Sequence, residues 1–193
     1  MNKLIFLLVG LITLGTKHQA GCPVSGSSNN TNLKQLDVLK NRNAPGTTID
    51  NSITLARILT PGNDVNRFNS NEYVTVTGFV IKVKAGGPET CECKSTNAQD
   101  LDIHIELAAK ATDIPTQAMV VEINRFTKAS HPEFTVGNLH SLVGKRITVT
   151  GWMMFDGEHL HNATTTNPGG SHNWRFTCWE VHPVLKLELS QEM

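Results

Sequence analysis

The chain lacks a hydrophobic run long enough to cross a membrane as a helix, which takes about 20 residues. Its one long apolar stretch is Leu4–Leu14. The chain is poor in aromatic residues, at 6%, and has no net charge, because 17 Lys and Arg residues balance 17 Asp and Glu residues. A groove that follows phosphates usually carries a marked basic excess. The charge balance therefore does not favour nucleic acid as a partner.

Sequence motifs of several reaction classes are also absent. No Gly-x-Ser-x-Gly sequence occurs, so nothing indicates a nucleophile elbow. Gly86-Gly87-Pro88 lacks the lysine and the hydroxyl residue of a phosphate-binding loop. There is no His-x-x-x-His pair and no Cys-x-x-Cys pair, which are common spacings of zinc ligands. Motifs alone therefore identify no reaction.

The N-terminus has the pattern of a secretory signal segment, predicted over residues 1–21. The apolar stretch Leu4–Leu14 has the length of a signal h-region, and Ala20-Gly21-Cys22 matches the end of a bacterial lipoprotein signal. Gln19 departs from that pattern, and ordinary cleavage after Ala20 is the alternative. We predict an exported protein of the cell envelope, periplasmic or secreted if not anchored. Lipidated Cys22 would be its first mature residue and its link to the membrane.

Two segments precede the main domain. Residues 22–32 are small and polar, which predicts a flexible tether. Residues 33–72 contain apolar residues at helical spacing and the loop signals Pro45-Gly46 and Pro61-Gly62. They predict a short helical and loop extension that packs on the domain at residues 73–189.

From Tyr73 onward the pattern indicates β-structure. The residue at every second position is apolar in several stretches, and β-branched residues are frequent. A segment of mixed character at 126–143 predicts a helical connection after the third strand. The predicted strands cover residues 73–83, 101–107, 118–123, 146–154 and 177–189.

This order of elements resembles the OB-fold, a five-stranded Greek-key barrel. Gly78 and Gly151 lie inside the first and fourth strands, where a tightly curved barrel needs a bend. The resemblance covers residues 73–189 and implies a mainly β fold. It also implies a ligand cleft between the loops at 84–100 and 156–173.

A second resemblance is to a group of uncharacterised secreted bacterial proteins, and it implies no activity. The shared stretches are His104-Ile105-Glu106-Leu107, Gly151-Trp152 with Asp156 and Glu158-His159, and Trp179-Glu180-Val181-His182-Pro183.

Polar side chains gather on one face of the second strand and one face of the fifth. Successive even positions of a strand point the same way, so His104 and Glu106 share a face with Asp102, and Glu180 shares one with His182. The loop before the fifth strand adds further polar and aromatic residues. The candidate ligand-binding residues are His104, Glu106, Glu158, His159, Trp174, Glu180 and His182.

Three interpretations of these residues compete. The first is an ordinary solvated sheet face without a ligand. The second is a zinc site built from His104, Glu106, His159 and His182, which would allow metal-dependent hydrolysis. The third is a metal-free polar cleft, with Trp174 as the candidate for stacking on a ring. We predict a binding module for an oligosaccharide, a nucleic acid or an envelope protein, with the hydrolase as the alternative.

The cysteines give a separate prediction. Cys91 and Cys93 are too close in sequence to bond each other without strain. If Cys22 carries lipid, an oxidising compartment favours a disulfide from Cys91 or Cys93 to Cys178. Free thiols and metal-bound thiolates are the alternatives.

Overall fold

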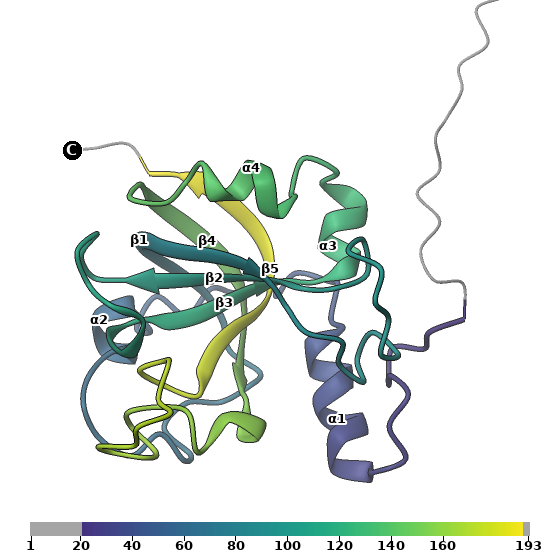
Figure 1. The fold of residues 1–193 in the computed structure, drawn as a ribbon, viewed down its shortest axis with the longest axis horizontal. Helices are drawn as coiled ribbons and strands as arrows, with labels where there is room; N and C mark the ends of the chain where they lie inside the picture. Colours follow the sequence, from purple (N-terminus) through teal and green to yellow (C-terminus); the bar gives the residue numbers. More distant parts are fainter. Residues whose placement is uncertain (1–20, 191–193) are drawn as a thin grey trace, which may run out of the picture.

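The computed structural model describes residues 21–190, and five strands close into a barrel at its centre (Figure 1). The barrel order is β1-β2-β3-β5-β4. This confirms the predicted mainly β, OB-like five-stranded barrel. The strands are β1 (Tyr73–Ala85), β2 (Ile103–Ala108), β3 (Met119–Ile123), β4 (Arg146–Phe155) and β5 (Trp179–Leu189).

Four of the five strand pairings are antiparallel, and the β3–β5 pairing that completes the ring is parallel. This joint is short: Val120 lies opposite Glu180, and Val121 lies opposite Val181. By contrast, β1 pairs with β4 continuously from Tyr73 to Phe79. The barrel is therefore closed by its shortest ladder.

Alternation along the strands sorts the side chains into an apolar interior and a polar outer face. On β2, Ile103, Ile105 and Leu107 belong to the hydrophobic core. On β5, Trp179 and Val181 do the same. The residues between them, which sequence analysis placed on shared polar faces, point away from this core.

Gly78 and Gly151 are needed because other atoms approach them too closely for a side chain. A Cβ on Gly78 would lie 2.5 Å from Leu55 Cδ2, and one on Gly151 would lie 2.2 Å from the Pro183 carbonyl oxygen. The register of β4 with β5 also shifts at Gly151. Both glycines thus allow close packing at the points where the sequence predicts a bend in the barrel.

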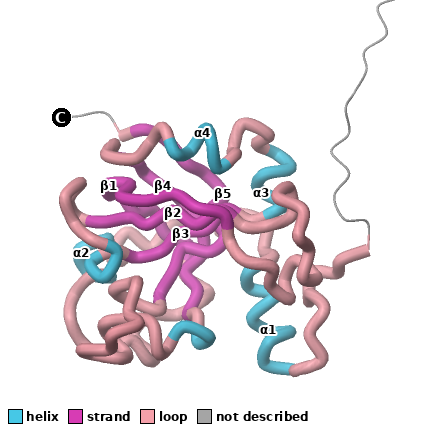
Figure 2. The backbone as a smooth tube through the Cα atoms, viewed as in Figure 1, coloured by secondary structure: helices cyan, strands magenta, loops and turns pink. Residues whose placement is uncertain are grey.

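Short helices lie around the barrel (Figure 2), and each of the four α-helices contacts a strand. The predicted extension contains α1 (Thr31–Lys40), capped by Asn30, and α2 (Leu55–Ile58), capped by Thr54. The predicted helical connection contains α3 (Arg125–Ser130) and α4 (Val136–His140). Two single 3-10 turns lie at Pro115–Gln117 and Gly157–His159. None of the described helices is long and apolar enough to span a membrane.

The segment predicted as a flexible tether lies against the loop that follows β1. Ser27 donates its backbone N–H to the Thr90 carbonyl, and Asn41 Nδ2 donates to the carbonyls of Val24 and Cys91. Small polar residues lack apolar surface to bury, but their backbone groups still find partners in the loop after β1. The predicted signal segment lies, except for Gly21, outside the described residues.

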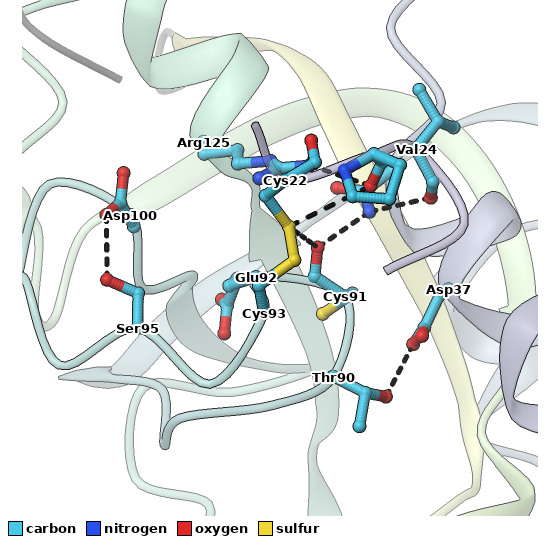
Figure 3. The surroundings of a disulfide bond; sticks show 12 residues. Cys22, Val24, Asp37, Thr90, Cys91, Glu92, Cys93, Ser95, Asp100 and Arg125 are labelled. Atoms are coloured by element: carbon cyan, nitrogen blue, oxygen red, sulfur yellow. Dashed lines mark hydrogen bonds between the residues drawn. A yellow bond between two sulfur atoms is a disulfide. The ribbon is translucent and has the colours of Figure 1, made fainter. Parts of the chain in front are cut away.

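A disulfide joins Cys22 to Cys93, which corrects two predictions (Figure 3). The sulfur of Cys22 is in that bond, so it is not free to carry a lipid. Cys178 is a free, buried thiol that contacts Thr166, and Cys91 is free and buried as well. The predicted bridge to Cys178 is therefore wrong. The pairing was missed because Cys22 was assigned to the lipid and was therefore left out of the disulfide.

Candidate functional site

The outer face of β2, β3 and the first part of β5 carries polar side chains that are buried. The sequence alone did not decide whether these side chains are in contact with solvent. Six of its acidic and histidine side chains are at most 6% exposed, whereas Glu188 near the end of β5 is exposed. The interpretation as a solvated sheet face is therefore wrong for these residues. They are Asp102, His104, Glu106, Glu122, Glu180 and His182.

Two loops and one helix cover this face. A Cβ on Gly86 would lie 3.0 Å from His104 Nε2, so the loop after β1 closes directly over this imidazole. The buried Arg175, in the loop before β5, forms an ion pair with Glu180. Lys40, at the end of α1, lies 3.8 Å from Asp156 Oδ2. The strand face is thus a charged layer between the barrel and its cover.

His182 lies at the centre of this layer and is completely buried. Its Nε2 is 3.1 Å from Asp102 Oδ2, and its Nδ1 is 3.3 Å from Glu122 Oε2 and 3.4 Å from Glu180 Oε2. Burial alone would lower the pKa of His182, but the three carboxylates, with Glu122 foremost, hold this pKa well above its usual range. An imidazole in this setting carries either a proton or another cation.

His104 and Glu122 occupy directly opposite positions of β2 and β3. His104 Nε2 lies 3.1 Å from Glu122 Oε1. Burial lowers the pKa of His104, but Glu122 outweighs it and the net shift is upward. The Glu122 carboxylate therefore lies between two imidazoles, with one oxygen toward each.

The carboxylates of this layer differ in their electrostatic setting. Burial raises the pKa of Glu180, but Arg175 and His182 lower it far more. His182 likewise keeps the pKa of Asp102 below its usual value despite burial. Glu92 has no such cation beside it, and burial together with Asp102 raises its pKa to about 8. At neutral pH Glu180 and Asp102 are charged and Glu92 is mostly protonated.

The Lys40 ammonium links the two covering loops. It forms an ion pair with Glu89 of the first loop and lies 3.8 Å from both Asp156 and Glu158 of the second. Burial would lower the pKa of Lys40, but Asp156 and Glu89 raise it well above the ordinary value. Lys40 therefore stays charged although it is 2% exposed.

A small cleft opens to solvent above Lys40, between the two loops. Its volume is about 240 Å³. Figure 1 shows the segment after β1 close to α1. This is the position at which the OB-like arrangement predicts a ligand cleft. The lining residues are Pro88, Glu89, Thr90, Lys94, Glu158 and His159.

Trp174 lies beside this cleft, but charged groups occupy its surroundings. The His159 ring meets it edge to face, with centroids 5.1 Å apart. Lys84 Nζ lies 4.2 Å from the centre of its ring, and the Arg175 guanidinium carbon lies 5.0 Å away. A ligand ring could stack on Trp174 only where such a cation moves aside. Trp174 therefore borders the cleft without lining it.

The predicted zinc ligands are only partly brought together. His104 and His182 meet around Glu122, whereas Glu106 lies 3.5 Å from Lys82 and His159 lies 3.8 Å from Asp156. The four do not form one ligand set. Within residues 21–190, two groups of three side chains have metal-ligating atoms close together. They are Asp102, Glu122 and His182, and Cys91, Glu92 and Asp102.

Three important residues of the layer were missed by sequence analysis. Glu122 is the one acidic residue of an otherwise apolar strand, and this isolated charge was an available signal. Lys40 is the last residue of α1, and Arg175 lies in the loop before β5. The residues next to them in the sequence do not indicate that either one has a distant partner. Their roles depend on tertiary packing.

Comparison with known proteins assigns no relative. No protein-family model matches the chain, and no curated protein matches its sequence.

Proposed function

We propose that this protein is an exported binding module that holds a hydroxyl-rich, uncharged ligand, of the oligosaccharide class, in the cleft between its two loops. The observation that carries the proposal is the cleft itself. It is lined by Glu89, Thr90, Glu158 and His159 from both loops and has the charged Lys40 below it. In OB-like barrels these two loops border the ligand site.

The chemistry of the lining favours hydroxyl groups over phosphates. Glu89 and Glu158 accept hydrogen bonds, and Thr90 and His159 can donate or accept them. Glu89 and Glu158 are balanced by Lys94 in the lining and by Lys40 beneath it, so the opening lacks the basic excess that a nucleic acid backbone needs. Larger hollows of about 600 and 560 Å³ lie elsewhere on the barrel. Neither hollow is lined by a carboxylate, whereas the cleft has two and the buried ammonium of Lys40 beneath them.

The disulfide supports the exported location. Bonds such as Cys22–Cys93 form and persist in oxidising compartments and are rare in the cytosol. The hydrophobic N-terminal stretch supports the same proposal.

The alternative function, metal-dependent hydrolysis, has less support. A hydrolytic metal needs an open coordination position that the substrate reaches. His104 and His182 are 6% and 0% exposed, beneath Gly86 and Arg175. Because these histidines are covered, a substrate could not reach a metal ion bound to them.

A glycan array probed with the purified protein tests the proposal. We expect binding to a restricted set of neutral glycans, and a loss of about tenfold or more in affinity for Glu158→Gln, because a carboxylate acceptor is a strong one. Glu188→Gln is the matched control, since Glu188 is an exposed β5 carboxylate that forms an ion pair with Lys186. Absence of glycan binding, or an equal effect of both variants, would refute the proposal.

A further inference from the structure

The two strands of the parallel joint and the residue that precedes β2 bring three metal-ligating side chains to the same place. Asp102 directly precedes β2, Glu122 is on β3, and His182 is on β5. One ligand atom from each lies within 4.8 Å of the other two. We propose that Asp102, Glu122 and His182 bind a divalent first-row transition-metal ion, such as zinc. This site is separate from the ligand cleft.

A second observation is that these buried atoms lack hydrogen-bond partners. Among residues 21–190, Asp102 Oδ1, Glu122 Oε2 and His182 Nε2 make no hydrogen bond. His104, 6% exposed, also has both ring nitrogens without one, and its Nε2 lies 3.1 Å from Glu122. Buried polar atoms are almost always satisfied, and each exception needs a reason. A cation among them supplies that reason.

The ligand types select the class of metal. Carboxylates alone would suit magnesium or calcium, whereas imidazole favours zinc, iron, copper or nickel. A histidine nitrogen with two carboxylate oxygens is within the set that zinc accepts. The two charges of Asp102 and Glu122 also balance a divalent ion, so no net charge would be buried.

The neighbours of His182 orient it for this role. A metal-bound histidine usually donates its second N–H to a carboxylate. His182 Nε2 lies 3.1 Å from Asp102, and Nδ1 lies 3.3 Å from Glu122 and 3.4 Å from Glu180. Arg175 holds Glu180 from its other side. Glu180 is thus a positioning residue, fixed by an arginine and directed at the imidazole.

The site lies where the barrel needs support. The β3–β5 ladder covers only two opposed residue pairs, and Glu122 and His182 come from these two strands. A metal ion bound by both, and by Asp102 next to β2, would join three strands at the closing joint. Three protein ligands leave one position of a tetrahedral zinc ion open, but the three side chains are buried away from any substrate, so the ion would act structurally.

The other candidate group, Cys91, Glu92 and Asp102, is less suitable. Glu92 Oε1 accepts from the Asp102 backbone N–H at 2.7 Å, and its Oε2 accepts from the Glu89 N–H at 3.1 Å. Both carboxylate oxygens are therefore already used by the loop. Burial also raises the pKa of the Cys91 thiol, although a metal needs the thiolate.

The test is a zinc titration of the chelator-stripped protein against a chromophoric competitor. We expect one tightly bound zinc ion per chain. Asp102→Asn should weaken its binding by at least about tenfold. Cys91→Ser and the exposed-histidine variant His131→Ala should bind zinc like the wild type. No zinc binding by the wild type, unchanged binding in Asp102→Asn, or loss in Cys91→Ser would each overturn the proposal.

An experiment on the wild type alone guards against a variant that does not fold. The X-ray absorption spectrum of the zinc-loaded protein should show nitrogen and oxygen ligands, at least one imidazole and no sulfur. A sulfur ligand would move the site to Cys91, and a shell of oxygens alone would remove His182 from it. Either spectrum contradicts the proposal. Glycan binding is measured separately, so its failure would not be confused with this one.

Discussion

His104 Nε2 lies 3.1 Å from Glu122 Oε1, across directly paired positions of β2 and β3. The pair is on the outer face of the barrel, yet the covering loops bury it. This pair belongs to a layer of buried charged side chains that lies beneath a small cleft.

The first prediction concerns the Cys22–Cys93 disulfide. Cys93→Ser should lower the free energy of unfolding by about 4 kcal/mol, because the bond constrains a loop of 71 residues in the unfolded chain. The measurement is denaturant unfolding under non-reducing conditions. Peptide mapping of the wild type should recover Cys22 joined to Cys93, with Cys91 and Cys178 unpaired. A lipid on Cys22, or any bridge to Cys178, would contradict the structure.

The second prediction concerns the buried ion pair of Arg175 and Glu180. Arg175→Met should destabilise the protein by about 3–5 kcal/mol, because it leaves a buried carboxylate without its partner. Adding Glu180→Gln should recover part of that loss. The comparison pair is exposed: Lys186→Met removes the partner of Glu188 and should cost about 1 kcal/mol or less. Equal losses at both pairs would show that burial does not matter here.

The third prediction is a pH dependence of stability in the presence of a chelator. The folded pKa values of His182 and Glu92 are raised above their ordinary values of 6.5 and 4.5, the latter to about 8. Each of these two groups contributes its full stabilising free energy at a pH below its ordinary pKa. That contribution is lost as the pH rises through the pKa of the group in the folded protein. Asp102 and Glu180 have lowered pKa values, so their contribution is lost only in acid.

We therefore expect the free energy of unfolding to be highest near about pH 5–6 and to fall toward about pH 8.5. Urea unfolding at several pH values provides the measurement. A stability that rises steadily from pH 6 to pH 8.5 would contradict the assignment of a protonated His182 in the metal-free protein.

The fourth prediction concerns Gly151. Gly151→Ala should destabilise the barrel by about 3 kcal/mol or more, because the new Cβ would lie 2.2 Å from the Pro183 carbonyl oxygen. Gly137→Ala is the matched control. It lies in α4 with no atom within 4 Å of the added Cβ, and should be neutral or stabilising by up to about 1 kcal/mol. The measurement is thermal unfolding of both variants. Equal destabilisation of the two would show that the loss at Gly151 does not come from its close packing.

The fold was largely predictable because its signals are local. Alternation gave five strands whose bounds differ by only a few residues from β1 to β5, and the glycines in two of them matched the close packing. Shared strand parity also placed Asp102, His104 and Glu106 on one face correctly. Periodicity reports which face a side chain occupies, and it carries this information at short range.

The site was less predictable because its partners are distant in sequence. Parity does not tell whether a polar face meets water or a loop, so the burial of His104 and His182 was left open. The pairing of Cys22 with Cys93 depends on a polar segment that periodicity treats as featureless. Lys40 and Arg175 reach the layer through tertiary packing alone.

The most direct test of the proposed function is a backbone amide NMR titration with a neutral glycan selected on the array. The account predicts that shift changes concentrate at residues 88–94 and 157–159, which line the cleft, with smaller changes at Trp174. It would be contradicted by changes centred on the hollow at Tyr73, Phe126 and Leu185, or by no changes at saturating glycan.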